Sequence, residues 1–310
     1  MVILLFFLLE ACTRIFYPEI KLPGTQQSLL KNSVFYDSQG YKPNSFGLSS
    51  DVLKRVDESG FLQYSSGRKS KNKILFLGDS VTMGIGVEND STFAGILNNS
   101  SAMITILNPS LIGYSSHDYK NIVKKLIDDE KNESGIKHIY IFWCLNDVYS
   151  NLPVSDSPEI ANDSFWNEIV IFLRNNSHFY HLLKSIISDR PKAYYLYDKN
   201  FYKREDKHFK QALNDLIEID SLAKENQLNV NLFLLPYEYQ LRDNLYRQRN
   251  SPQKLLTKKL KFSSIKTHDC AAAFNIDENV DDYYLFGDGI HFSILGHKAM
   301  AKFIAQQIKN

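Results

Sequence analysis

The chain has 310 residues, of which 44% are hydrophobic and 13% aromatic, and this is enough for one substantial core or for one core with a long insertion. Its 36 Lys and Arg residues balance 35 Asp and Glu residues, so there is no global electrostatic reason to expect nucleic acid as a partner. The three cysteines, Cys12, Cys144 and Cys270, lie far apart without metal-ligand spacing, so we expect no disulfide framework and no metal.

The chain begins with a short apolar segment, Met1 to Leu9, which is far shorter than the ~20 residues that a membrane-spanning helix needs. No basic segment precedes it, and no small-residue cleavage site follows it. Two interpretations stay open: a signal or anchor whose start lies upstream, or an ordinary buried strand. We expect residues 1–17 to be signal- or anchor-like, and residues 18–72, rich in Ser, Gly, Asn, Lys and Tyr, to form an extended region of small strands that wraps the main domain.

The main domain is expected to span residues 73–310 and to begin with a continuous apolar run, Ile74 to Leu77, that Gly78 ends. Such a run is typical of a central parallel strand covered on both faces. The same reasoning predicts three more strands and two helices: strands at Met103–Leu107, His138–Trp143 and Val230–Leu235, and helices at His117–Asp128 and at Ser293–Ile308, the latter capped by Ser293. This alternation predicts an α/β fold with a parallel sheet, whose ligands bind at the carboxyl ends of the strands.

An insertion interrupts the alternation at about residues 149–226, and we expect it to form a helical cap. It is rich in aromatic residues, such as Phe179 and the Tyr194–Tyr197 cluster. Aromatic side chains at such spacing serve either packing or substrate contacts, and the sequence leaves both interpretations open.

Gly78-Asp79-Ser80 follows the first predicted strand directly, so the Ser80 hydroxyl is expected at the carboxyl edge of the sheet near the start of a helix. A small glycine allows a sharp turn there, and a backbone N–H at a helix start can stabilise an oxyanion. The structural alternative is that Ser80 only caps the helix while Asp79 satisfies loop amides.

Near the other end of the chain, Asp288 and His291 stand three residues apart, just before the last predicted helix. A serine hydroxyl needs a base to take its proton, and that base needs an acceptor that fixes its tautomer. Asp288 can hold the imidazole while the other ring nitrogen faces Ser80. The pattern predicts a Ser80, Asp288, His291 triad.

Four blocks in this order, Gly78-Asp79-Ser80, Gly113, Asn146-Asp147 and Asp288-x-x-His291, resemble those of the SGNH hydrolases, the GDSL-like lipases and esterases. The similarity extends to flanking residues and covers most of Lys73 to Ile308 except the insertion. The resemblance implies a three-layer α/β/α, flavodoxin-like fold around a central parallel sheet. It also implies an oxyanion hole made by the Ser80 N–H, the Gly113 N–H and the Asn146 side-chain amide.

The chain departs from the family pattern at one position, because Cys144 stands where the third block usually has glycine. That glycine is not a hydrogen-bond donor in the mechanism, so its loss bears on the local backbone path more than on the chemistry. We interpret Asp147 as a loop organiser. The segment Gly40 to Asn44 also resembles bacterial members that begin with a membrane segment, which favours a cell-envelope location, anchored or exported, over a cytoplasmic one.

We therefore predict a serine esterase that uses no cofactor and cleaves an acyl ester of a lipid, a glycan or a small alcohol through an acyl-enzyme on Ser80. If a sugar hydroxyl replaces water as acceptor, the same site is an O-acyltransferase. With water as acceptor, a deacetylase of envelope glycans is a further alternative. A third alternative is a binding protein that keeps the fold without turnover. The expected partners are small ester substrates and, through the N-terminus, a membrane, with no nucleic acid.

Overall fold

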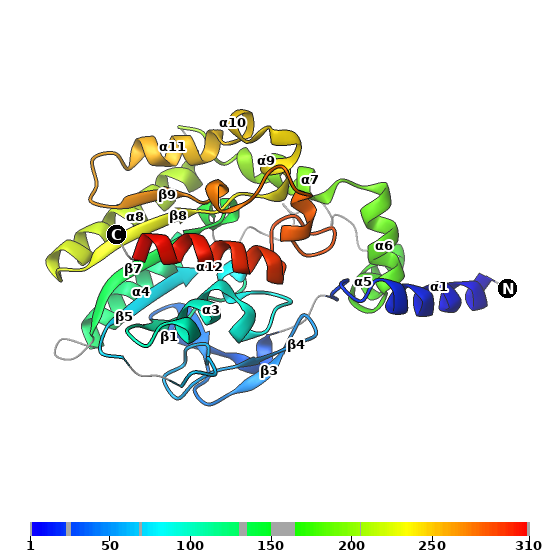
Figure 1. The fold of residues 1–310 in the computed structure, drawn as a ribbon, viewed down its shortest axis with the longest axis horizontal. Coiled ribbons are helices and arrows are strands. Elements are labelled where there is room, and N and C mark those ends of the chain that lie inside the picture. Colours follow the sequence, from blue (N-terminus) through cyan, green and yellow to red (C-terminus); the bar gives the residue numbers. More distant parts are fainter. Residues whose placement is uncertain are drawn as a thin grey trace.

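A five-stranded sheet forms the centre of the computed structural model, which describes residues 2–22, 26–67, 70–129, 135–149, 165–204 and 206–308. Every neighbouring pair of strands is parallel (Figure 1). Across the sheet the strands are β6 (Thr105–Leu107), β5 (Lys73–Gly78), β7 (Ile136–Trp143), β8 (Asn229–Leu234) and β9 (Lys266–Asp269). Numbered in chain order this is 2-1-3-4-5, the flavodoxin-like arrangement, so the predicted fold class is confirmed.

The apolar strands are buried because helices cover both faces of the sheet. Aromatic rings link three neighbouring strands: the centroids of Phe76 and Phe142 are 4.8 Å apart, and those of Phe142 and Phe233 are 5.0 Å apart. All three side chains are fully buried. Three strands differ from expectation by more than one residue. β6 begins at Thr105, two residues later than predicted, and β7 begins at Ile136, two residues earlier; β9 was not predicted because Lys-Thr-His-Asp has no apolar run.

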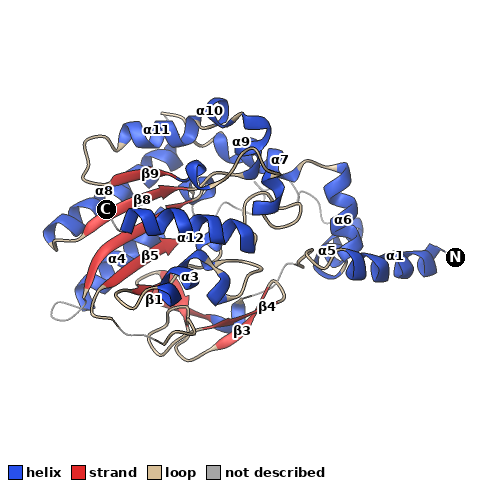
Figure 2. Cartoon of the chain, viewed as in Figure 1, coloured by secondary structure: helices blue, strands red, loops and turns tan. Residues whose placement is uncertain are grey.

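One helix pair lies on each face of the sheet (Figure 2). Helices α3 (Phe93–Ser100) and α12 (Ile294–Ile308) pack together on one face, and α4 (Ser116–Asp129) and α8 (Lys207–Glu225) on the other. Ser293 Oγ accepts from the Gly296 N–H at 3.3 Å, as its predicted capping role requires. Helix α8 lies within the predicted insertion, yet it belongs to this helical layer.

Shorter helices connect the sheet strands. Helix α2 (Ser80–Met83) follows β5 directly, and three more lie between β8 and β9: α9 (Glu238–Leu241), α10 (Tyr246–Arg249) and α11 (Ser251–Lys259). Helix α2 is the element that matters most for the site, because it begins at the predicted nucleophile.

Two β-hairpins precede the sheet in the chain, pairing β1 (Leu30–Phe35) with β2 (Ser38–Tyr41) and β3 (Phe46–Ser49) with β4 (Val52–Arg55). They carry buried groups into the main domain. The hydroxyl of Tyr41 donates to Ser110 O at 2.8 Å, and the Lys54 ammonium lies fully buried among the carbonyls that follow α2.

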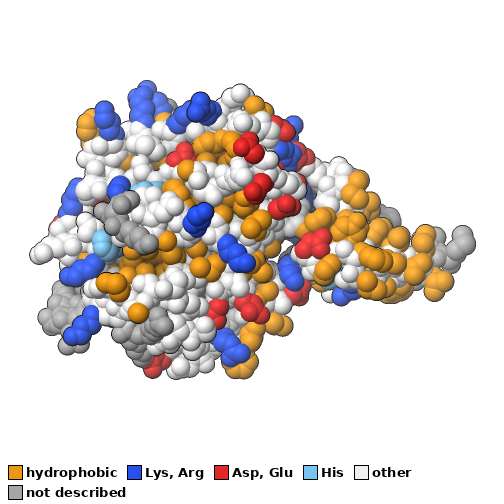
Figure 3. Space-filling view, viewed as in Figure 1, with side chains coloured by type: hydrophobic (Ala, Val, Ile, Leu, Met, Phe, Trp, Pro, Cys, Tyr) orange, Lys and Arg blue, Asp and Glu red, His pale blue; other side chains and the backbone are white. Residues whose placement is uncertain are grey.

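Helices α1 (Val2–Phe16), α5 (Phe165–Asn176) and α6 (His178–Ile187) form a protrusion from the body of the molecule (Figures 1 and 3). The interpretation of the apolar N-terminal segment as a buried strand is wrong, because Val2–Phe16 is helical and several of its side chains are exposed. None of the described helices combines the length and apolarity needed to cross a membrane. The protrusion exposes apolar side chains from all three helices: Leu4, Leu5, Phe7, Leu8, Ile15, Phe16, Val170, Ile171, Phe172, Leu183, Ile186 and Ile187.

The predicted insertion also contains α7 (Arg190–Lys199), which leads toward the body of the protein. Its residues 150–164 lie outside the described residues. Tyr195 of α7 is buried, and its hydroxyl donates to Arg249 O at 2.7 Å, so this aromatic residue serves packing.

Candidate active site

The turn after β5 presents Ser80 at the carboxyl edge of the sheet. Asp79, not Ser80, caps helix α2, because Asp79 Oδ1 accepts from the Val81 N–H at 2.9 Å. The interpretation of Ser80 as a mere cap is therefore wrong. A Cβ atom at Gly78 would lie 1.9 Å from Thr82 Oγ1, so only glycine allows this turn. The Ser80 N–H begins the helix and has no intrahelical acceptor.

Ser80, His291 and Asp288 form one hydrogen-bonded line. His291 Nε2 lies 2.8 Å from Ser80 Oγ, and His291 Nδ1 lies 2.9 Å from Asp288 Oδ1. Asp288 Oδ1 also accepts from the N–H groups of Ile290 at 2.9 Å and His291 at 2.7 Å. Since an aspartate at Nδ1 keeps that nitrogen protonated, Nε2 is free to accept the serine proton.

The charges in this line stabilise one another. Burial alone would raise the pKa of Asp288, but the His291 charge and the hydrogen bonds outweigh it and lower the pKa to about 2. For His291, burial lowers the pKa and Asp288 raises it by more, so the net shift is upward. The carboxylate is thus ionised throughout the range in which the imidazole titrates.

Two backbone hydrogen bonds, one within the loop and one from α9, hold the loop that carries Asp288 and His291. The Leu285 N–H donates to His291 O at 2.8 Å, and the Glu238 N–H donates to Gly289 O at 2.9 Å. Gly289 has φ +77°, and a Cβ atom there would lie 2.4 Å from Pro191 Cβ. Helix α7 therefore packs directly against this loop.

On the opposite side of Ser80, Asp79 links the nucleophile to Asn146. Asp79 Oδ2 lies 3.0 Å from Ser80 Oγ and accepts from Asn146 Nδ2 at 3.1 Å. Gly113 lies exposed in the loop after β6, and within the described residues its N–H donates no hydrogen bond. The Ser80 N–H and, through Asp79, the Asn146 amide therefore lie beside the Ser80 hydroxyl. Gly113 lies at the same carboxyl edge of the sheet.

The loop of Asn146 tolerates Cys144 because that residue has φ −90° and ψ 157°, an extended conformation open to any residue type. The Cys144 N–H donates to Asp147 Oδ2 at 2.8 Å, in keeping with the interpretation of Asp147 as a loop organiser. Both side chains are buried.

Three polar residues of this site were not predicted. Tyr237 follows β8 and its hydroxyl lies 3.3 Å from Asn146 Oδ1, while Asp198 of α7 and Tyr149 complete a hydrogen-bonded group behind Asn146. The position of Tyr237 just past a predicted strand is a signal that could have found it. Asp198 has no such signal, because its place depends on the packing of α7.

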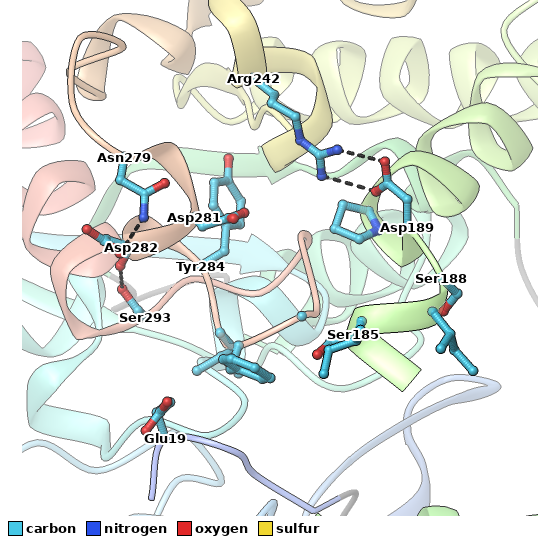
Figure 4. A pocket seen from close by; sticks show the side chains of 16 residues that line it. Glu19, Ser185, Ser188, Asp189, Arg242, Asn279, Asp281, Asp282, Tyr284 and Ser293 are labelled. Atoms are coloured by element: carbon cyan, nitrogen blue, oxygen red, sulfur yellow. Dashed lines mark hydrogen bonds and ion pairs between the residues drawn. The ribbon is translucent and has the colours of Figure 1, made fainter. Parts of the chain in front are cut away.

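A cavity of about 930 Å³ lies beside the catalytic loop (Figure 4). The segment Leu285–Gly287, directly before Asp288, forms one wall, and none of the triad residues lines the cavity. On the opposite wall Arg242 binds both oxygens of Asp189, at 2.7 and 3.1 Å. Within the described residues, no group of three or more His, Cys, Asp or Glu side chains is arranged to hold a metal ion.

Residues 74–304 match the model of the GDSL-like lipase/acylhydrolase family. No curated protein matches the sequence. Similar solved structures include a lipolytic protein of the G-D-S-L family from Veillonella parvula, at 14% identity and a TM-score of 0.46, covering 77% of this chain and 98% of that one. A catalytic mutant of an acetylxylan esterase from Geobacillus stearothermophilus is similar at 16% identity and a TM-score of 0.47, covering 77% and 94%.

Proposed function

Since the chain belongs to the GDSL-like lipase/acylhydrolase family and is a hydrolase of ester bonds, we propose that it cleaves carboxylic esters through an acyl-enzyme on Ser80. The observation that carries the proposal is the unbroken line from Ser80 Oγ through His291 to Asp288, with 2.8 and 2.9 Å between successive polar atoms. A neutral imidazole at hydrogen-bond distance from a hydroxyl is the arrangement that activates serine.

The reaction proceeds in two acyl transfers. His291 Nε2 takes the Ser80 proton as Oγ attacks the ester carbon, and the carbonyl oxygen becomes an oxyanion. The imidazolium then returns the proton to the departing alcohol as the C–O bond breaks, which leaves the acyl group on Ser80. Water attacks the acyl-enzyme with the same base, and collapse of the second oxyanion releases the acid and restores the hydroxyl.

Three donors serve the oxyanion in this proposal: the N–H groups of Ser80 and Gly113 and the Asn146 amide. The Ser80 N–H adds the favourable field of a helix start. Removal of one oxyanion donor costs ~10²- to 10³-fold in kcat in serine hydrolases. Asn146→Ala is therefore expected to lower kcat to that extent.

Covalent labelling with a fluorophosphonate tests the proposed nucleophile. Wild type is expected to gain one adduct by intact mass, and peptide mapping is expected to place it on Ser80. Ser80→Ala is expected to gain none, and His291→Ala to react much more slowly. A folded wild-type protein that gains no adduct would exclude an activated serine.

The substrate is an acyl ester of a lipid, a glycan or a small alcohol. A panel of aryl esters with acyl chains of increasing length, followed by acetylated sugars and phospholipids, measures which class gives the highest kcat/KM. Release of free acid from the best substrate identifies water as the acceptor, whereas acyl transfer to an added sugar identifies an O-acyltransferase.

We further propose that the protein lies at the cell envelope, where the protrusion of α1, α5 and α6 rests on a lipid surface. The support is the set of exposed apolar side chains on all three helices. Burial of such side chains in a bilayer interface is favourable by about 25 cal/mol per Å² of apolar surface. Co-sedimentation with phospholipid vesicles is expected for wild type and is expected to weaken at least tenfold in the double variant Leu8→Ser, Phe16→Ser.

A further inference from the structure

The Asn146 amide is held from two sides. Its Nδ2 donates to Asp79 Oδ2 at 3.1 Å, and its Oδ1 faces the Tyr237 hydroxyl at 3.3 Å. A carboxylate can only accept hydrogen bonds, so Asp79 favours the NH₂ end on the nucleophile side. One N–H is thereby engaged by Asp79, and the second is left for an oxyanion at Ser80.

Tyr237 is in turn anchored by a carboxyl from helix α7. Its single hydroxyl proton is shared between Asp198 Oδ2 at 2.6 Å and Asn146 Oδ1 at 3.3 Å, while Asp198 Oδ1 accepts from the Tyr149 hydroxyl at 2.7 Å. Tyr237 is fully buried, and Asp198 is 3% exposed. Both oxygens of this carboxyl are therefore occupied by phenol groups, one of which also reaches Asn146.

The surroundings of Asp198 are unusual for a buried carboxyl, because the described residues supply no cation to pair with it. Burial raises its pKa to about 6, the two phenol hydrogen bonds partly oppose the rise, and the charge of Asp79 adds to it. The other titratable groups that face it are also acidic: Cys144, Asp147, Tyr149, Tyr202 and Tyr237. An apolar side chain would cost less to bury, so packing alone does not account for Asp198.

A second contact from the predicted insertion fixes the backbone beside Asn146. The Tyr202 hydroxyl donates to Leu145 O at 2.9 Å and accepts from Trp143 Nε1 at 2.7 Å. Residues 198 and 202 thus reach the same loop, one toward the Asn146 side chain and one toward the neighbouring carbonyl.

We propose that Asp198 and Tyr237 are positioning residues of the oxyanion hole. Asp198 anchors the Tyr237 hydroxyl behind Asn146, and the hydroxyl keeps the amide turned with its N–H groups toward Ser80. The predicted insertion takes part in catalysis in this way without touching the substrate. The inference rests on the proposed function of Asn146 as an oxyanion donor.

A double-mutant cycle with Asn146→Ala tests the proposal, with kcat and KM measured on a short-chain aryl ester. Tyr237→Phe removes only the hydroxyl, and it is expected to lower kcat about tenfold with KM within about twofold. In the Asn146→Ala background it is expected to change kcat less than twofold, because the group it positions is gone. Tyr195→Phe is the matched control: it removes a buried phenol hydroxyl of the same helix α7, which donates to Arg249 O at 2.7 Å and not to the Asn146 group, and kcat is expected to stay within about twofold.

Substitution of Asp198 provides a rescue test. Asp198→Asn keeps a neutral group that can accept from one phenol and donate to the other, so kcat is expected to stay within about threefold of wild type. Asp198→Ala removes the anchor and is expected to lower kcat about tenfold, again only when Asn146 is present. Thermal unfolding of each variant shows whether the compared proteins are folded. If Asp198→Ala does not fold, the double-mutant cycle of Tyr237→Phe with Asn146→Ala still tests the positioning role.

An equal loss of kcat from Tyr237→Phe with and without Asn146 would overturn the positioning role, and so would an equal loss from Tyr195→Phe. The proposed function would survive either result provided that Ser80 is still labelled and Asn146→Ala still lowers kcat. If Asn146→Ala kept the wild-type kcat, Asn146 would not be an oxyanion donor. The positioning role of Asp198 and Tyr237 would then fall as well.

Discussion

Ser80 and His291 are 211 positions apart in the sequence, yet Ser80 Oγ lies 2.8 Å from His291 Nε2. The contact exists because the first sheet strand and the loop before the last helix meet at the same edge of the sheet. Asp288 lies on the far side of the imidazole, 2.9 Å from Nδ1. This arrangement ties the reaction rate to the protonation state of one histidine.

The first prediction concerns pH. Only neutral His291 can take the Ser80 proton, so kcat/KM is expected to fall as pH drops through the pKa of His291. Burial lowers that pKa and Asp288 raises it by more, so the midpoint lies above 6.5. Asp288→Asn removes the charge that raises it, so the midpoint is expected to move to lower pH, and kcat is expected to drop by ~10⁴-fold as the tautomer is lost. The measurement is a pH–rate profile of both proteins, and an unmoved midpoint would contradict the assignment of Asp288.

The second prediction concerns the packing of α7 against the catalytic loop. In Gly289→Ala the new methyl group would meet Pro191 at 2.4 Å, so the loop must shift. A displacement of ~1 Å at a reacting group costs ~10²-fold in rate, and we expect a loss of that size in kcat. The control is Gly67→Ala, which also has positive φ but no atom within 4 Å of the new Cβ. It is expected to cost about 1 kcal/mol of stability from backbone strain and to leave kcat unchanged.

The parts of the fold and of the site differ in how far sequence reasoning could reach them. The apolar runs of β5, β7 and β8 predicted these strands, because a strand buried on both faces needs such a run. The polar strand β9 gave no such signal. The blocks around Ser80 and His291 are local in sequence and could be recognised as text. The contact of Asp198 with Tyr237 could not, since it arises only when α7 packs against α9 and the loop of Asn146.

The third prediction concerns Lys54, whose ammonium is fully buried and donates to the carbonyls of Met83, Gly84 and Val87 at 3.1, 2.8 and 2.6 Å. Lys54→Met leaves these carbonyls without a donor, which is expected to lower the free energy of unfolding by about 3 kcal/mol. Because they directly follow the nucleophile helix, kcat is expected to fall as well.

Lys42→Met is the control for Lys54, since Lys42 Nζ makes a single exposed contact to Ser28 O at 3.0 Å. It is expected to change stability by less than about 0.5 kcal/mol. Urea unfolding and steady-state kinetics compare the pair. Equal stability of the two variants would show that the buried ammonium does not hold the nucleophile turn.

The last prediction concerns Glu10, which joins α1 to the start of α6. Its carboxylate accepts from Ser177 Oγ at 2.7 Å and from the N–H groups of His178 and Phe179, both at 3.0 Å. Burial raises the pKa of Glu10, but these hydrogen bonds, together with one from Arg14, outweigh it and lower the pKa to about 2. A folded-state pKa below the ordinary 4.5 means that the stabilisation is present above pH 4.5 and is lost as pH falls toward 2.

Glu10→Ala is therefore expected to release α1 from α6 at neutral pH. Loss of a capping carboxylate costs ~1 kcal/mol, which is about fivefold in the local opening equilibrium, and amide hydrogen exchange in α1 and the first turn of α6 should accelerate accordingly. Exchange in the sheet and kcat on a soluble ester are expected to stay unchanged, because the contact is remote from Ser80. Arg14→Ala removes one partner of the carboxylate and an exposed hydrogen bond to Asn176 O at 3.1 Å but leaves the contacts of Glu10 with α6, so it should accelerate exchange less. If α1 exchanges at the wild-type rate without Glu10, apolar packing such as that of Phe6 on Phe179 holds the helix instead.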